Sequence, residues 1–308
     1  MSLIELFKRP GPSGFGFAST ADDVTSGINL QGRTILVTGC NSGIGYETVR
    51  ALAKRGARVI ATARSEEKAR AACSALGPEV VPLACDLAAP SSVRSAVRAV
   101  KDRGWRLDAL IANAGIMALP KLEQAFGYEL QFFTNHIGHF LLVTGLLDEL
   151  AEDGRVVMVS SDAHWRAPRA GIELDNLSGE KRYDPWSAYG QSKLANLLFA
   201  KELAKRLSGT QKTANAIHPG VIRTNLGRSM PWILRTALRI GEPFVLKTAE
   251  QGAATQCYVA THPGLARVSG QFFADCNVAK SSPISYDATL AARLWQESEQ
   301  IAAQVAQH

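Results

Sequence analysis

Short apolar runs recur along most of the chain and alternate with longer segments of mixed polarity. The short runs are rich in Val, Ile, Leu and Ala, and they end near small or polar residues. Runs of this kind are typical of buried strands. They predict seven strands, at Arg33–Thr38, Arg58–Ala63, Val80–Cys85, Leu107–Ala112, Arg155–Ser160, Ala214–His218 and Gln271–Ala274.

The segments between these runs have the spacing of helices. Strands that alternate with helices, and that are apolar almost throughout, indicate a parallel sheet covered on both faces. The pattern therefore predicts an α/β fold with a doubly wound parallel sheet of about seven strands flanked by helices. The predicted helices lie at Gly45–Arg55, after Ser65 as a capping residue, at Pro90–Lys101, around Gln131–Leu150 and around Tyr189.

The first 30 residues differ from the rest of the chain. They are rich in Gly, Pro, Ser and Thr, which predicts an irregular N-terminal arm over residues 1–30. No break in composition, internal repeat or low-complexity tract divides the remainder. We expect residues 31–308 to form one dinucleotide-binding and catalytic domain.

Composition narrows the class of protein. An apolar fraction of 46% and a charged fraction of 20% are typical of a globular protein with a sizeable core. The formal net charge of +6 is mild, and no dense Lys/Arg tract with interleaved aromatic residues indicates nucleic-acid binding. No apolar run is long enough for a signal peptide or a membrane span, so we expect a cytoplasmic protein.

Cysteines and histidines give no sign of a metal site. The five cysteines are scattered and form no C-x-x-C pair, which fits reduced thiols in the cytosol. His136 and His139 lie three positions apart, but no third ligand lies near them in the sequence. We expect no metal ion, and we expect both histidines to pack in a helix.

A glycine-rich turn joins the first predicted strand to the first predicted helix. In TGCNSGIG, Gly39, Gly43 and Gly45 leave the backbone N–H groups open to a pyrophosphate at the helix N-terminus. In NAD-binding proteins an acidic residue usually follows the second strand and binds the ribose hydroxyls. Here that position is Arg64, whose guanidinium suits a 2′-phosphate. The sequence thus predicts a Rossmann-type domain that prefers NADP(H), with NAD(H) as the second choice.

The segment WSAYGQSK places Tyr189 four residues before Lys193. Residues i and i+4 share one face of a helix, so the lysine ammonium can stabilise a phenolate and lower its pKa from about 10. Such a tyrosine can exchange a proton with a substrate oxygen while hydride moves between carbon and nicotinamide. An ordinary helix pair remains the alternative for these two residues.

Five motifs stand in one order along the chain: TGCNSGIG, ANAG, VSS, YGQSK and HPG. Over roughly residues 30–280 this order resembles the short-chain dehydrogenase/reductase family. NHIGHFLL and the segment Asn176–Leu203 are similar to its retinol-dehydrogenase and WW-domain-oxidoreductase branch. Members of that branch often carry an N-terminal hydrophobic anchor, and we expect none in this protein.

The resemblance implies roles for particular residues. Tyr189 matches the general acid/base, Lys193 its partner, Ser161 the anchor of the substrate oxygen, and Asn135 the residue of the proton relay. It also implies a homodimer. The implied cofactor contacts are Gly39, Asn41, Ser42, Gly43, Ile44, Gly45, Arg64, Asp86, Leu87, Asn113, Ala114, Gly115, Tyr189, Lys193, Pro219, Gly220, Val221 and Thr224.

Two positions depart from the family pattern. Ser42 stands where NADP-preferring members often have a basic residue, so the coenzyme preference rests on Arg64 alone. Ala112 replaces the first asparagine of the common NNAG motif, and we expect little effect. Two simpler readings stay open: Ser160 rather than Ser161 as the working serine, and Asn135 as a brace of its own helix.

The substrate is expected to be a small hydrophobic carbonyl or alcohol. The segment 226–247 combines apolar residues with four basic ones and could be a lid, a contact with a membrane surface, or a helix packed on the body. Two other functions remain: a C=C double-bond reductase of the same fold, and a weakly catalytic NADP-binding scaffold or sensor.

Overall fold

A single large sheet organises the chain. The computed structural model describes residues 9–222 and 246–306, and its sheet has eight strands in the order β10-β9-β8-β7-β4-β1-β2-β3. All neighbours are parallel except β10, which pairs antiparallel with β9. The strands are β1 Thr34–Thr38, β2 Arg58–Ala63, β3 Val80–Ala84, β4 Leu107–Ala112, β7 Leu150–Val159, β8 Thr213–His218, β9 Phe272–Ala274 and β10 Asn277–Val278.

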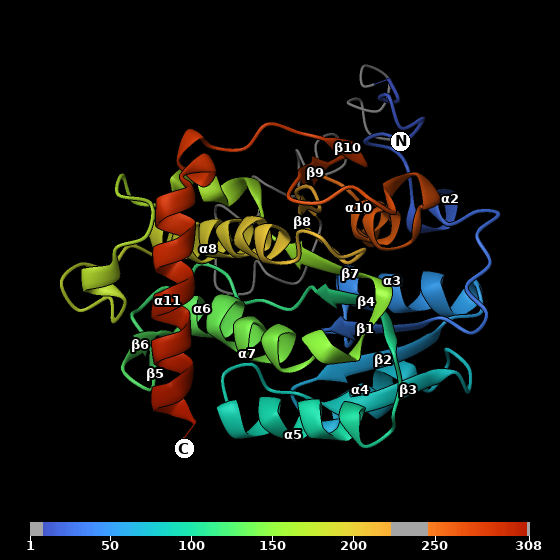
Figure 1. Ribbon diagram of the computed structural model, residues 1–308, viewed down its shortest axis with the longest axis horizontal. Coiled ribbons are helices and arrows are strands. Elements are labelled where there is room, and N and C mark those ends of the chain that lie inside the picture. The colour runs from blue at the N-terminus through green and yellow to red at the C-terminus, as the bar shows by residue number, and fades with distance from the viewer. Residues whose placement is uncertain (1–8, 223–245, 307–308) are drawn as a thin grey trace.

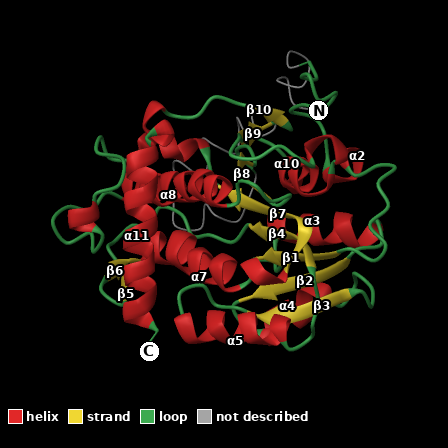
Figure 2. Ribbon diagram, viewed as in Figure 1, coloured by secondary structure: helices red, strands yellow, loops and turns green. Residues whose placement is uncertain are grey.

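Helices cover both faces of this sheet (Figures 1 and 2). Successive side chains of a strand point to opposite faces, so Ile35 and Val37 enter one hydrophobic cluster and Leu36 enters another. The first cluster includes residues of α2 Ala21–Val24, α3 Gly43–Lys54, α4 Glu66–Cys73 and α10 Ala249–Thr261. The second includes residues of α5 Pro90–Lys101, α7 Gly138–Gly145 and α8 Pro185–Arg206. The prediction of a doubly wound α/β fold is confirmed.

Local sequence signals fix where the helices begin. Asp184 caps α8, with its side chain accepting from the Ser187 N–H at 2.7 Å, and Pro185 occupies the first helical position. Ser65 caps α4 by accepting from the Lys68 N–H, as expected. The Asp184 cap therefore fixes the residue at which α8 begins.

The long helix predicted around Gln131–Leu150 is present over residues 130–145, but it contains a π-helical turn and ends before Leu150. The segment contains α6 Leu130–Phe132, a π-helical turn Phe133–Ile137, α7, and a 3-10 turn Leu147–Glu149, and Leu150 already belongs to β7. The sequence there is apolar on all sides, so its periodicity cannot reveal a turn that contains an extra residue.

Both ends of the chain contain structure that the sequence pattern did not indicate. Within the expected irregular arm, Thr20 and Asp23 form a reciprocal capping box that starts the short helix α2. Near the C-terminus, α11 Ala288–Val305 packs against α8 (Figure 1). Its Trp295 stacks on Phe199 at 5.3 Å between ring centroids.

A small hairpin of β5 Gln124–Ala125 and β6 Tyr128–Glu129 lies outside the main sheet.

Candidate active site

The predicted site residues gather at the carboxyl ends of β1, β4, β7 and β8. In a parallel doubly wound sheet this edge is where ligands bind. Neighbouring strands β1 and β4, β4 and β7, and β7 and β8 bring the five motifs together from distant parts of the sequence. The site is therefore a product of the topology rather than of any one segment.

The glycine turn after β1 has the backbone that its sequence predicts. Gly39 and Gly43 have φ values of 75° and 56°, in the left-handed region that favours glycine. A Cβ atom on Gly45 would lie 2.0 Å from the Gly39 carbonyl oxygen, so no larger residue fits. Asn41 and Ser42 are exposed at the tip.

The first turn of α3 can receive an anion. Ser42 is its N-cap, and its side chain makes no capping hydrogen bond. The N-terminal N–H groups of a helix lack partners within the helix and carry partial positive charge. Ile44 is half-buried and packs against the core, which anchors the turn from below. This geometry fits a pyrophosphate.

The Thr38 hydroxyl ties the glycine turn to the segment after β4. Its oxygen accepts from the Asn113 and Ala114 N–H groups, each at 2.9 Å. Its own hydrogen is then left for His139 Nε2, also at 2.9 Å. The Asn113 side chain donates in addition to the Thr38 carbonyl at 2.7 Å. Asn113 thus acts here as a brace of the cofactor turn.

Arg64 and Asp86 lie at the ends of β2 and β3, on the side expected for adenosine. The Arg64 guanidinium is exposed, and it forms no hydrogen bond or ion pair with any part of the chain that the structure describes. Asp86 accepts from the Ala88 N–H at 3.0 Å. The Leu87 side chain is buried, and its carbonyl lies against Gly138.

Asn135 lies in the π-helical turn and holds the segment after Gly115. Its side chain accepts from the Ile116 N–H at 2.8 Å and donates to the Ile116 carbonyl at 2.9 Å. A second donation reaches the Ser192 hydroxyl on α8. A Cβ on Gly115 would stand 3.1 Å from the Asn135 amide oxygen and 3.3 Å from Lys193 Nζ. Asn135, Gly115 and Lys193 therefore face one small space.

Tyr189 and Lys193 lie one turn apart on α8, beside the end of β7. The Tyr189 ring is partly exposed, whereas Lys193 is buried and donates to the Val159 carbonyl at 3.0 Å. Ser160 is buried too, and its hydroxyl donates to the Lys193 carbonyl at 2.7 Å. The Ser161 side chain, by contrast, interacts with the Tyr189 hydroxyl and lowers the pKa of that tyrosine. Of the two serines, Ser161 is the one that faces the tyrosine.

Burial shifts the pKa values of this pair in opposite directions. Desolvation raises the pKa of Tyr189 to about 12, although the interaction with the Ser161 side chain opposes the rise. Desolvation also lowers the pKa of Lys193 to about 8. We expected the lysine to lower the tyrosine pKa. In the protein alone the pKa of Tyr189 is set by burial and Ser161, and Lys193, whose Nζ lies 5.7 Å from the tyrosine ring centroid, is not among the causes of the shift.

The HPG motif forms the loop after β8. Gly220 has a φ of 95°, and a Cβ there would meet the Lys247 side chain at 2.6 Å. Lys247 is buried and pairs with Asp275 at 2.6 Å. Val221 is 61% exposed. Thr224, and most of the segment 226–247 that was expected to cover the substrate, lie outside the described residues.

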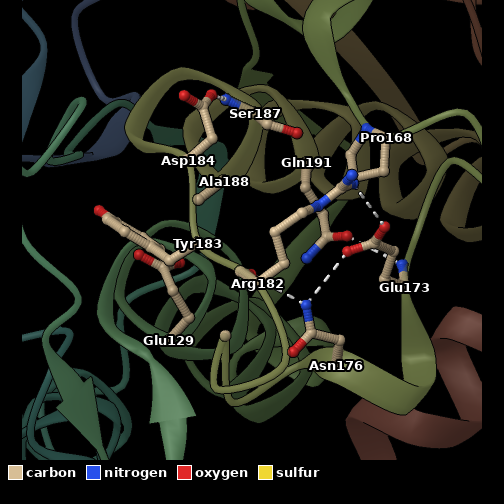
Figure 3. A pocket seen from close by; sticks show the side chains of 11 residues that line it. Glu129, Pro168, Glu173, Asn176, Arg182, Tyr183, Asp184, Ser187, Ala188 and Gln191 are labelled. Atoms are coloured by element: carbon tan, nitrogen blue, oxygen red, sulfur yellow. Dashed lines mark hydrogen bonds and ion pairs between the residues drawn. The ribbon is translucent and has the colours of Figure 1, made fainter.

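A cavity of about 260 Å³ lies beside the start of α8 (Figure 3). No predicted site residue lines it. Several of its polar groups are already paired: Glu173 binds Arg182 and Asn176, each at 3.2 Å.

Of the described residues, no group of three or more His, Cys, Asp or Glu side chains could hold a metal ion. No helix in the described part of the chain is long and apolar enough to cross a membrane.

A glycine turn at a helix N-terminus, an exposed basic residue after β2, and a Ser–Tyr–Lys group at the end of β7 fit a nicotinamide dinucleotide. These features define a class of protein, the dinucleotide-binding α/β oxidoreductases.

Comparison with known proteins gives the family. The family model for short chain dehydrogenase matches residues 33–231. The chain is 42% identical to Short-chain dehydrogenase TIC 32 A, chloroplastic, from Brassica napus, covering 94% of this chain and 95% of that protein. It is 38% identical to human Retinol dehydrogenase 14 over 88% of this chain and 86% of the relative.

Solved structures agree. A protein of uncharacterised function from Mycobacterium paratuberculosis has a TM-score of 0.75 at 36% identity, covering 93% of this chain and 98% of that one. A short-chain dehydrogenase from Burkholderia cenocepacia in complex with NADP has a TM-score of 0.64 at 28% identity, covering 80% and 97%. The chain belongs to the short-chain dehydrogenase family, and it is an NAD(P)-dependent oxidoreductase that acts on alcohol or carbonyl groups.

Sequence reasoning missed two residues that the geometry draws into the site. His139 connects Thr38 to the Asn135 carbonyl, to which its Nδ1 donates at 2.8 Å. His164 contacts the Ser161 carbonyl. Each also binds a partner far away in the chain, Thr38 for His139 and Ser282 for His164, and no local motif could have indicated that contact.

Proposed function

We propose that the protein is an NADP(H)-dependent reductase of hydrophobic aldehydes or ketones that can also run in the alcohol-oxidising direction. The observation that carries this proposal is the Ser161–Tyr189–Lys193 group, whose tyrosine is partly exposed and whose lysine is buried behind it. A tyrosine with a raised pKa stays protonated near neutral pH, which suits proton donation to a carbonyl oxygen.

Each residue of the group has a distinct task in this proposal. Ser161 donates a hydrogen bond to the substrate oxygen and so orients the carbonyl towards Tyr189. Tyr189 transfers its proton to that oxygen during reduction and takes it back during oxidation. A bound nicotinamide dinucleotide would supply or accept the hydride. The buried Lys193 ammonium favours the phenolate that proton transfer leaves behind, and it can bind the nicotinamide ribose.

Asn135 completes the proton relay in this proposal. Its side chain fixes Ile116 and reaches the Ser192 hydroxyl, so it holds the Gly115 backbone beside Lys193. The relay would then run from Tyr189 through Lys193 to the space that Asn135 borders. The alternative role of Asn135, a brace of the π-helical turn, uses the same contacts and is compatible with the relay.

The preference for NADP(H) rests on Arg64. Its guanidinium is exposed at the end of β2, and no hydrogen bond or ion pair with the described residues would have to be broken before it binds a ligand. A guanidinium can bind a 2′-phosphate in bidentate fashion, whereas an acidic residue would repel it. The similarity to the short-chain dehydrogenase from Burkholderia cenocepacia, which was solved in complex with NADP, supports the same assignment.

The substrate class is supported by the relatives. Several of them are named retinol dehydrogenases, at 38–41% identity. We propose a hydrophobic substrate with a primary or secondary alcohol or the matching carbonyl, retinoids among the candidates. A C=C reductase of the same fold needs the same cofactor site and remains the second candidate. A non-catalytic scaffold is disfavoured because Ser161, Tyr189 and Lys193 are all present and grouped.

A substrate panel tests the proposed reaction. Purified protein with NADPH is offered apolar aldehydes, ketones and activated alkenes of matched chain length, and products are identified by mass. We expect alcohols from the aldehydes or ketones. Saturated carbonyl products from the alkenes alone would favour the C=C reductase, and no turnover with any class would support the scaffold.

A further inference from the structure

The peptide group that follows Ser161 is held on both edges by imidazole rings. The Ser161 carbonyl accepts from His164 Nδ1 at 2.6 Å. The Asp162 N–H donates to His218 Nδ1 at 3.2 Å. His164 lies in the 3-10 helix Asp162–Arg166, whereas His218 ends β8. Two separate elements therefore fix one peptide immediately after the serine that faces Tyr189.

The partners of His164 determine its tautomer. Nε2 lies 2.9 Å from the Ser282 N–H, which can only donate, so Nε2 is the acceptor. The Ser161 carbonyl can only accept, so Nδ1 must carry the hydrogen. The two assignments are independent and agree. Both ring nitrogens are occupied, and the ring is 1% exposed and packs edge-on against Phe272 at 5.2 Å.

These contacts join the serine to a distant part of the chain. Ser282 lies between β10 and α11, and 118 positions separate it from His164. The preceding side of Ser161 is already fixed, because Ser160 donates its N–H to Ile217 and its hydroxyl to Lys193. The following peptide is held by the His164 backbone N–H, which donates to the Ser161 carbonyl at 3.0 Å, and in addition by the His164 and His218 rings.

We propose that His164 is a positioning residue that sets the orientation of the Ser161 hydroxyl. The Ser161 Oγ accepts from the Ala163 N–H at 3.1 Å, which leaves its hydrogen for Tyr189 or a substrate oxygen. A rotation of the Ser161 carbonyl turns the serine backbone and moves this hydroxyl away from the tyrosine. The proposal rests on the proposed function, in which Ser161 orients the substrate carbonyl.

Two substitutions separate the two hydrogen bonds of His164. An asparagine amide nitrogen lies close to the position of Nδ1, so H164N can still donate to Ser161 but loses Ser282. A glutamine amide lies close to the position of Nε2, so H164Q can still contact Ser282 but loses Ser161. Each variant gives up one hydrogen bond, to the buried Ser282 N–H or to the half-buried Ser161 carbonyl. The melting temperature of each variant measures its effect on folding.

Turnover is expected to distinguish the variants. Because small misplacements of a reacting group are costly, we expect kcat of H164Q to fall about 10- to 100-fold and that of H164N to stay within about threefold of wild type. The KM for NADPH and the melting temperature should match between them. Equal kcat values, or a loss of kcat that follows the melting temperature, would overturn the proposal.

An S161A variant separates this proposal from the proposed function. Full turnover by S161A would remove the serine from the mechanism, whatever His164 does. A deficient S161A with equally active H164N and H164Q would leave the mechanism intact and refute the role of His164.

The tautomer of His164 gives a test that uses the wild-type protein alone. In a long-range ¹H–¹⁵N spectrum of ¹⁵N-histidine-labelled wild-type protein, the ring that contacts Phe272 should carry its hydrogen on Nδ1. A hydrogen on Nε2 of that ring would contradict both hydrogen bonds and the proposal with them.

Discussion

At the residue scale, the site works through burial as much as through residue type. The same desolvation that keeps Tyr189 protonated makes Lys193 easier to deprotonate. Near neutral pH Tyr189 is therefore neutral and Lys193 is still mostly charged, so a phenolate forms only when proton transfer, the lysine ammonium and a positive nicotinamide ring stabilise it. The Tyr-x-x-x-Lys spacing predicts that the two side chains share one face of a helix. It does not predict the direction of their pKa shifts, because that direction depends on how the rest of the fold buries them.

Arg64 gives a coenzyme prediction at this scale. We expect Arg64→Asp to reduce kcat/KM for NADPH by about 100-fold, because a carboxylate repels the 2′-phosphate that the guanidinium would bind. The value for NADH should change little or rise. Steady-state kinetics with both coenzymes measure the ratio. If the wild-type protein used NADH as efficiently as NADPH, the assignment of the phosphate contact to Arg64 would be wrong.

At the element scale, the backbone turns shape the candidate active site more than the helices and strands that they connect. Strands β1, β2, β4 and β8 can be predicted from their apolar sequences, and the glycine turn can be predicted from its sequence motif. The π-helical turn at Asn135 is not, since an extra residue in an apolar helix leaves no trace in the pattern. His164 could not be predicted either, because Ser282 is brought to it only by the complete fold.

Gly45 provides the prediction at the element scale. A Cβ at this position would lie 2.0 Å from the Gly39 carbonyl oxygen, a backbone atom that cannot move without opening the turn. We expect Gly45→Ala to weaken NADPH binding at least tenfold, measured by fluorescence titration. Gly264→Ala is the control, since its nearest neighbour is the His262 side chain at 3.2 Å, outside the cofactor turn. Equal binding by both variants would contradict the proposed phosphate site.

At the scale of the whole molecule, buried neutral histidines connect the layers. His136 joins the π-helical turn to Ser298 of α11 at 2.9 Å, and His139 joins α7 to β1. Burial lowers the pKa of His136 to about 3 and that of His139 to about 4. Burial also lowers the pKa of His164 and of His218. All four contribute to the fold in their neutral forms.

This arrangement predicts acid sensitivity. The folded-state pKa values lie below the unfolded value of 6.5, so the stability they contribute is complete above pH 6.5 and is lost as the pH falls towards 4. Within that window, each such histidine lowers the free energy of unfolding by about 1.4 kcal/mol for every unit by which the pH falls. Urea unfolding at pH 7.5, 6.0 and 5.0 measures the slope. A free energy of unfolding that stays constant from pH 7.5 to 5.0 would contradict it.

The central claim is that Tyr189 transfers the proton, and Tyr189→Phe tests it most directly. The substitution removes one hydroxyl and keeps the ring that packs against Trp186 at 6.3 Å, so folding and NADPH binding should persist. With an aldehyde that the wild-type protein reduces, we expect kcat to fall by about 10³-fold, within the range for loss of a general acid. Normal NADPH binding with wild-type turnover in this variant would contradict the account.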